Sequence, residues 1–195
     1  MKKIGPVLII LALIGILVIW GVRAYNGLVT LDETVSSQWA NVENVYQRRA
    51  DLIPNLVATV KGYAEHEQET FIAVTEARSK ASSINVDPTK LTNESLQQFQ
   101  AAQEGLSSAL SRLLVVVERY PDLKANQNFL DLQAQLEGTE NRITVERMKF
   151  NDTAKSYNTA IRKFPRNLLA SMFGFDQKPY FEASEGAEEA PKVEF

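Results

Sequence analysis

The stretch FLDLQAQLEGTENRITVERMKFNDTAKSYNTAIRKF, residues 129–164, decides the fold. A large apolar side chain recurs in it at every seventh position, and most positions between are polar. A seven-residue spacing returns to the same face of an α-helix after two turns, so the stretch predicts one continuous helix with a single inward stripe. The stripe comprises Phe129, Leu136, Ile143, Phe150, Tyr157 and Phe164.

Three other segments carry apolar side chains at helical spacing, and no segment has the alternation of a strand. We therefore predict an all-α fold. After an N-terminal anchor, residues 24–165 would form an antiparallel up-and-down four-helix bundle, with long helices at roughly 24–50, 54–82, 91–119 and 124–164. The three ladders are Leu28, Leu31, Val35, Trp39, Val42 and Tyr46; Leu56, Val60, Tyr63, Thr70, Val74 and Ala77; and Leu96, Phe99, Gln103, Leu106, Leu110, Leu113, Val117 and Tyr120.

The first 23 residues predict a single transmembrane helix. No charge interrupts the 19 residues from Ile4 to Val22, close to the ~20 that cross a bilayer core of about 30 Å. A cleaved signal peptide is the alternative, but the apolar run is long for one and Arg23 is badly placed for cleavage. The residues predicted to face lipid are Ile4, Val7, Leu8, Ile9, Ile10, Leu11, Leu13, Ile14, Ile16, Leu17, Val18, Ile19 and Trp20.

Composition narrows the range of functions. The chain has no cysteine, so disulfides and thiolate metal sites are excluded, and its single histidine excludes a site with two imidazoles. The net charge of −3 lacks the basic excess of a nucleic-acid-binding protein. We predict no metal, no cofactor, no small-molecule substrate and no nucleic acid.

A repeated motif is expected at two corners of the bundle. Arg48-x-x-Asp51-Leu52-x-x-Asn55 matches Arg119-x-x-Asp122-Leu123-x-x-Asn126, and each window contains a proline. The simpler interpretation is helix capping by the two aspartates. Because the first and third connections of an up-and-down bundle share one end, the motif also predicts a membrane-distal tip that binds a partner. Its residues would be Arg48, Arg49, Asp51, Arg119 and Asp122.

Polar residues also enter the long final helix at QLEGTEN, residues 135–141. Thr139 lies in a column beside the apolar stripe and Glu140 lies next to it, so both are candidates for buried polar groups. A buried glutamate needs a partner such as an arginine, or a raised pKa. Catalysis by Glu137 and Glu140 is a remote alternative, because uniform helical ladders predict no pocket.

The end of the final helix is expected to return to the bilayer, and its last turns bring basic and apolar residues together, as an interfacial segment requires. The alternative is that NLLASMFGF, residues 167–175, covers the open end of the bundle. Residues 166–195 comprise this short amphipathic segment and an acidic C-terminal tail, and the tail after Phe175 is not expected to be ordered. The candidate interfacial residues are Arg162, Lys163, Phe164, Arg166, Leu168, Leu169, Met172 and Phe173.

Ordered motifs along nearly the whole chain resemble the LemA family. They are YNGLV at 25–29, QRRADLIPNLV at 47–57, VKGYAEHE at 60–67, QLEGTENRI at 135–143 and PYFEA at 179–183, with PKVEF at the end. The resemblance implies a bacterial membrane protein with a solvent-exposed bundle of long helices, and it supplies no catalytic residues. For relatives it implies a cytoplasmic bundle, whereas Lys2, Lys3 and the amino terminus against Arg23 favour a bundle outside the cytoplasm.

These patterns predict a non-enzymatic scaffold in the bacterial cytoplasmic membrane, anchored in the lipid bilayer. It would bind identical copies or other proteins through its exposed helix faces and its tip. An accessory or chaperone factor of a membrane protease is the main alternative.

Overall fold

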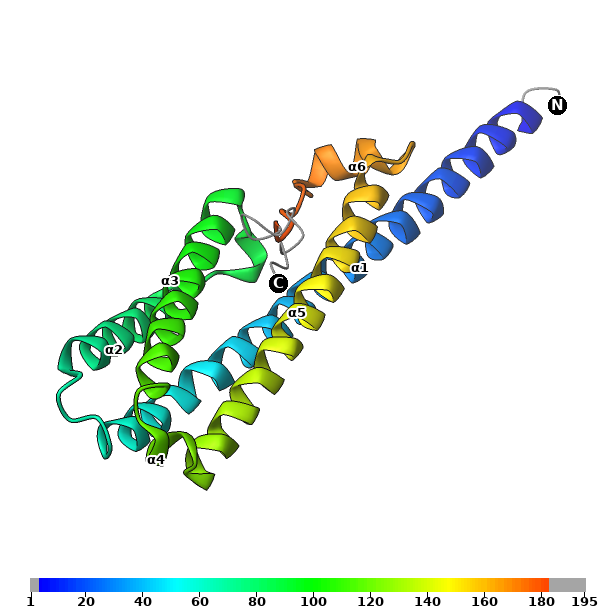
Figure 1. Ribbon diagram of the computed structural model, residues 1–195. Helices are drawn as coiled ribbons and strands as arrows, with labels where there is room; N and C mark the ends of the chain where they lie inside the picture. Colours follow the sequence, from blue (N-terminus) through cyan, green and yellow to red (C-terminus); the bar gives the residue numbers. More distant parts are fainter. Residues whose placement is uncertain (1–3, 183–195) are drawn as a thin grey trace, which may run out of the picture.

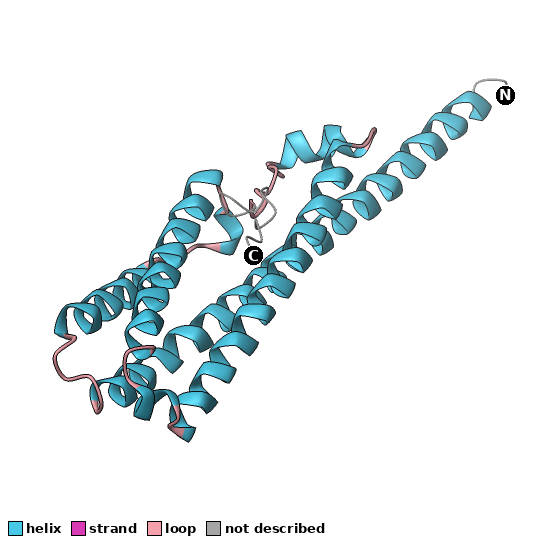
Figure 2. Ribbon diagram, viewed as in Figure 1, coloured by secondary structure: helices cyan, strands magenta, loops and turns pink. Residues whose placement is uncertain are grey.

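The computed structural model describes residues 4–182, and all regular structure in that range is helical (Figures 1 and 2). No strand occurs among those residues, which confirms the all-α prediction. The elements in chain order are α1 (Ile4–Lys61), α2 (Gln68–Ser83), the 3-10 helix η1 (Pro88–Lys90), α3 (Asn93–Val117), α4 (Pro121–Lys124), α5 (Gln127–Arg162) and α6 (Arg166–Phe173).

Two helix pairs make up the core. α1 lies along α5, and α2 lies along α3 (Figure 1). α2 also contacts α1, which joins the two pairs. The apolar N-terminal part of α1 extends beyond every other helix, so it projects from the core as a single helix. We call the end of the core nearest this segment proximal and the opposite end distal.

α1 is one helix of 58 residues, and the corner predicted at residues 48–54 is wrong. Pro54 lies inside this helix, although a proline has no N–H to donate to the carbonyl four residues earlier. That carbonyl belongs to Ala50, and Arg78 of α2 donates its Nε–H to it at 2.7 Å. A side chain from the neighbouring helix thus replaces the missing backbone donor, and the helix continues.

The first reversal of the chain lies instead at residues 62–67, so α2 begins at Gln68 and not at residue 54. At 1.5 Å per residue, the 16 residues of α2 span about 24 Å and the 36 residues of α5 about 54 Å. α2 therefore covers only part of the α1–α5 pair.

Helix caps differ from those predicted at both corners. Asp51 lies inside α1 and accepts a hydrogen bond from Gln47, so it does not cap a helix. Asp122 lies in the first turn of α4, while Asn126 caps α5 by accepting from the N–H of Phe129.

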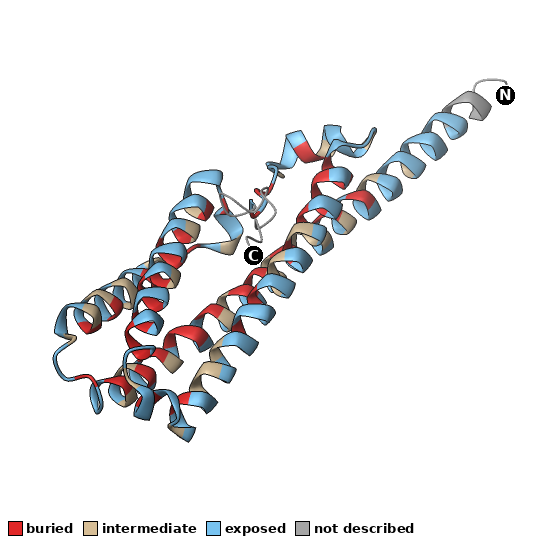
Figure 3. Ribbon diagram, viewed as in Figure 1, coloured by how far each residue is buried: buried red, intermediate tan, exposed pale blue. Residues whose placement is uncertain are grey.

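The buried apolar side chains form two clusters. Figure 3 shows where buried residues lie along each helix. The distal cluster is mostly aliphatic and includes every buried residue of α2, whereas the proximal cluster contains no residue of α2 and has an aromatic centre. The distal cluster is Ile53, Leu56, Val60, Ala64, Phe71, Val74, Ala81, Leu106, Ala109, Leu110, Leu113, Val116, Val117, Leu123 and Phe129. The proximal cluster is Leu28, Val35, Trp39, Val42, Tyr46, Val86, Leu91, Leu96, Phe99, Ile143, Phe150, Ala154, Tyr157, Ala160, Ile161, Ala170 and Phe181.

Residues 175–182, which we call the C-terminal strap, complete the proximal cluster. Phe181 stacks on Trp39 with ring centroids 5.9 Å apart and meets the edge of Phe150 at 5.3 Å. The prediction that order ends at Phe175 is therefore wrong for residues 176–182, because burial of Phe181 holds them on the core. Residues 183–195 lie outside the described residues.

Candidate functional site

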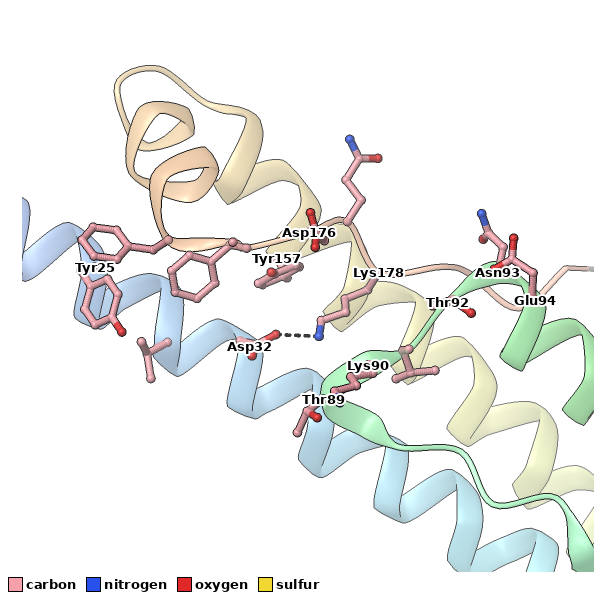
Figure 4. Close-up of a pocket in the computed structure, with 16 residues that line it drawn as sticks. Tyr25, Asp32, Thr89, Lys90, Thr92, Asn93, Glu94, Tyr157, Asp176 and Lys178 are labelled. Carbon is pink, nitrogen blue, oxygen red and sulfur yellow. Dashed lines mark ion pairs between the residues drawn. The ribbon is translucent and has the colours of Figure 1, made fainter.

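A cavity of about 680 Å³ lies at the proximal end, where α1, α5 and the strap meet the segment leading into α3 (Figure 4). Tyr25 of α1 forms one edge, which places the cavity next to the apolar segment. Its charged side chains are of both signs: Asp32, Lys90, Glu94, Asp176 and Lys178.

Lys178 is the central cation of this cavity. The structure buries it, and its Nζ lies 2.9 Å from Oδ1 of Asp32 on α1 (Figure 4). The same ammonium lies 5.6 Å from the ring centroid of Tyr157, at cation–π distance. A buried charge needs such partners to offset its lost hydration, so the pair ties the strap to α1.

Asn158 on α5 fixes the backbone at Lys178. Its amide donates to the carbonyl of Lys178 at 2.8 Å and accepts from the N–H of Lys178 at 2.9 Å. Asn151, seven residues earlier on the same helix, makes the equivalent pair with Phe181 at 2.9 and 2.8 Å. The strap has no helix or strand of its own, so these two amides satisfy backbone groups that would otherwise be buried without partners.

The phenol of Tyr157 also faces the cavity. Burial raises its pKa above the ordinary value, and the charges of Asp32 and Asp176 raise it further. The phenol is therefore protonated at neutral pH. Within residues 4–182, no three histidine, aspartate or glutamate side chains come together as metal ligands.

A second buried cation lies between the two apolar clusters. Arg49 is 2% exposed and joins three helices. Its guanidinium donates to Oε1 of Gln103 at 2.6 Å, to Oγ of Ser107 at 3.0 Å and to Oε2 of Glu140 at 3.0 Å. It also lies over the ring of Tyr46, 5.1 Å from the centroid.

The two candidate buried polar residues of α5 have different surroundings. Thr139 is buried and donates to the carbonyl of Gln135. Glu140 is not buried, since its side chain is 56% exposed, and its partner Arg49 is the buried member of the pair. Glu137 is exposed and accepts from Gln133. The two carboxylates do not share a buried pocket.

The predicted tip is divided by the structure. Arg119 and Asp122 lie at the distal end, where Arg119 pairs with Glu67 of the first reversal at 3.0 Å. Arg48, Arg49 and Asp51 lie inside α1, so they are not at the tip. Arg49 precedes Lys61, the last residue of α1, by 12 residues, or about 18 Å at 1.5 Å per residue. Arg48 and Asp51 are exposed there, while Arg49 is in the core.

The candidate interfacial residues surround α6, which contacts α1. α5 ends at Arg162, so Phe164 is neither helical nor buried, and the inward stripe ends at Tyr157. Phe173 meets Tyr25 edge-on, with centroids 4.9 Å apart. Leu169 is half-buried, and the other residues are exposed: Arg162, Lys163, Phe164, Arg166, Leu168, Met172 and Phe173.

The apolar segment of α1 is long and apolar enough to cross a membrane. From Leu8 to Trp20 its large side chains are exposed, as lipid contact requires. Ile4 and Val7 lie in the helix.

Sequence reasoning missed the polar groups that organise the proximal end: Asp32, Asn151, Asn158 and Lys178. One signal was available, since the two asparagines are seven residues apart and each follows a residue of the apolar stripe. Their partners, however, are backbone groups of the strap, and no local pattern indicates a partner 20 or 30 residues away.

Comparison with known proteins agrees with the motifs. The profile described as LemA family matches residues 38–195, which is most of the chain and includes the last 24 residues of α1 and all later helices. The chain belongs to the LemA family. This confirms the resemblance seen in the sequence.

Among relatives of this LemA-family chain is the magnetosome protein MamQ of Magnetospirillum gryphiswaldense, 28% identical over 176 residues. That match covers 80% of this chain and 64% of MamQ, so the chain spans less than two thirds of that relative. Protein LemA of Metamycoplasma hominis is 27% identical over 184 residues, covering 94% of this chain and 80% of the relative. Together with the apolar segment, these relatives indicate a membrane protein of the LemA type.

Proposed function

We propose that the protein is a non-enzymatic scaffold anchored in the bacterial cytoplasmic membrane by α1, with α1, α2, α3 and α5 acting as one four-helix bundle. Its exposed surfaces would bind other copies of the chain or other proteins. The observation that carries the proposal is the continuity of α1, which runs from the apolar segment into the core without a break.

A continuous helix fixes the bundle relative to its anchor. Leu28, six residues after Val22 ends the apolar segment, is already fully buried, and Tyr25 packs on Phe173 and Phe175. No flexible linker therefore separates anchor and core. A bundle held in one orientation presents the same faces to every neighbour in the membrane plane, and confinement to that plane raises the effective concentration of binding partners.

The core leaves apolar side chains available for such contacts. Val115 on α3 is 68% exposed, and Ile72 on α2 and Met148 on α5 are also exposed. The distal tip adds Arg119 and Asp122. The names of the relatives support the proposal in one respect, since a magnetosome protein is named for a cellular assembly and not for a reaction.

Crosslinking in intact membranes tests this proposal. The chain has no native cysteine, so a single cysteine can be placed at Val115 and, in a separate variant, at the exposed polar Ser156 of α5. We expect a short bismaleimide to give dimers or larger species at native expression, with more product from Val115→Cys than from Ser156→Cys. Monomer alone from both variants, with no protein retained in an affinity purification after amine crosslinking, would overturn the scaffold proposal.

The same Val115→Cys variant determines the side of the membrane that the core occupies. Labelling by an impermeant maleimide in cells with a permeable outer envelope would place the core outside the cytoplasm, as Lys2 and Lys3 favour. Protection until the inner membrane is lysed would place it in the cytoplasm, the side implied by family resemblance.

A further inference from the structure

We propose that α6 and the turn before it form a second membrane contact, which lies in the headgroup region of an anionic bilayer beside the point where α1 enters it. The inference rests on α1 being the membrane anchor and does not depend on any protein partner.

The position of α6 is the first argument. α5 runs back toward the proximal end, and α6 follows it beside α1 (Figure 1). Phe173 of α6 contacts Tyr25 of α1, which lies three residues after Val22, the end of the uncharged segment. α6 therefore packs on α1 just beyond that segment. A helix packed on α1 at this level lies where hydrocarbon gives way to headgroups.

The exposed apolar side chains are the second argument. Phe164 is 81% exposed and Met172 is 74% exposed, with Leu168 midway between them in sequence. Leu168 and Met172 are four residues apart and share one face of α6, whereas Ala170 faces the core. Large apolar residues clustered on one exposed face of a short helix indicate an interaction surface.

The charges identify the partner as lipid. From Tyr157 to Phe175 the chain has three basic residues, Arg162, Lys163 and Arg166, and no acidic residue. On α1, the charge nearest the apolar segment is Arg23, and no acidic residue precedes Asp32. Basic residues beside an apolar face at headgroup level can bind the anionic phosphates of lipids. The surface also adjoins the membrane segment, which a protein-binding surface would not need to do.

Backbone geometry also holds α6 in place. Gly174 ends the helix with φ of 73°, a left-handed conformation that glycine adopts without strain. The chain then turns, and the N–H of Phe175 bonds to the carbonyl of Ala170 while its ring packs on Tyr25 at 5.7 Å. α6 is therefore fixed to α1 at both the helix and the turn that follows it.

Depth-dependent fluorescence quenching tests the contact. The full-length chain with a single NBD-labelled cysteine at Met172 would be reconstituted into vesicles of phosphatidylcholine and phosphatidylglycerol that contain nitroxide lipids. Leu130→Cys is the matched control, because it is an exposed apolar position at the distal end of α5 that is not among the proposed contact residues, and Ile14→Cys reports on the anchor itself.

We expect lipid nitroxides to quench the label at Met172 severalfold more than the label at Leu130, with shallow nitroxides more effective than deep ones. Aqueous iodide should show the opposite preference. In addition, Lys163→Glu combined with Arg166→Glu should reduce quenching at Met172 in anionic vesicles and leave Ile14 unchanged.

Two results would overturn the inference. A label at Met172 that only iodide quenches would show a face open to water, and one protected from both quenchers would show a face covered by protein. If lipid nitroxides also fail to quench the label at Ile14, the proposal that α1 anchors the protein in the membrane is wrong. If lipid nitroxides quench the label at Ile14 but not the label at Met172, only the proposed membrane contact of α6 is wrong.

Discussion

In the distal half of the core, α2 and α3 pack on α1 and α5 through aliphatic side chains such as Leu56, Leu106 and Leu113. In the proximal half, α2 contributes nothing, and the strap and an aromatic centre around Trp39 complete the packing. The distal half therefore buries its apolar surface mainly between helices, whereas the proximal half buries it between helices and an extended segment.

The difference shows what an extended segment requires of its neighbours. A helix satisfies its own backbone groups, so aliphatic contact is enough to hold it. The strap has no such internal bonds, and the proximal half supplies Asn151 and Asn158 for its backbone and Asp32 for its lysine. Stability of the proximal half should therefore depend on individual side chains more than stability of the distal half does.

The largest expected effect is that of Trp39→Ala. Trp39 is fully buried against Phe99, Phe150 and Phe181, so its loss should lower the free energy of unfolding by about 3–5 kcal/mol. It should also release the strap, which limited proteolysis of the solubilised chain followed by mass spectrometry would detect as cleavage within residues 175–182. The distal control Leu113→Ala should also destabilise the chain but leave the strap protected. Equal cleavage in both variants would show that the halves are not distinct.

Arg49→Ala, at the boundary of the two clusters, should have the next largest effect. It removes a buried cation that joins three helices, and we expect a loss of about 3 kcal/mol in urea unfolding. Arg49→Met should recover part of this loss, because an apolar side chain of similar length refills the space.

Glu140→Gln changes the exposed member of the same ion pair. Because Glu140 is mostly exposed and Arg49 keeps Gln103 and Ser107, we expect a loss of only about 1 kcal/mol or less. The same variant bears on the enzymatic alternative. Loss of cellular function without loss of fold or assembly would support catalysis by Glu140 and count against a purely structural role.

Asn158→Ala should have an intermediate effect confined to the proximal half. Two hydrogen bonds to the backbone of Lys178 are lost, and the N–H and carbonyl become unpaired, at a cost of about 1–3 kcal/mol. Hydrogen exchange should accelerate in the strap and not in α2. Ser156→Ala, at an exposed position of the same helix, is the matched control and should change neither region.

The smallest effect is expected at the distal tip. Arg119 is exposed and pairs with Glu67 at the surface, so Arg119→Ala should change thermal stability by the equivalent of about 0–1 kcal/mol. If the tip binds a partner, this variant should weaken crosslinking while the melting temperature stays the same. Unchanged crosslinking would show that Arg119 is not part of the binding surface.

Sequence patterns predicted the helical class, the apolar N-terminal segment and most inward residues of the long helices; Tyr63 is an exception, because it lies in the first reversal and is exposed. Each of these follows from a local pattern. Side chains three, four or seven residues apart share a helix face, and an uncharged run of bilayer length can be identified from neighbouring residues alone. The stripe from Phe129 to Tyr157 faces the core as predicted, apart from the half-buried Leu136.

The end of α1, the surroundings of Arg49 and the order of the strap depend on tertiary contacts. Pro54 was predicted to lie at a break between helices. The structure keeps it in a helix because Arg78, on another helix, donates to the carbonyl of Ala50 that the proline leaves without a donor. Arg49 was predicted to lie at the distal tip, and the sequence did not reveal its partners because they lie on α3 and α5. The strap lacks periodicity, and its order comes from Asn151, Asn158 and Trp39, far away in the chain. In each case the missing information was a hydrogen-bond or packing partner that is adjacent in space and distant in sequence.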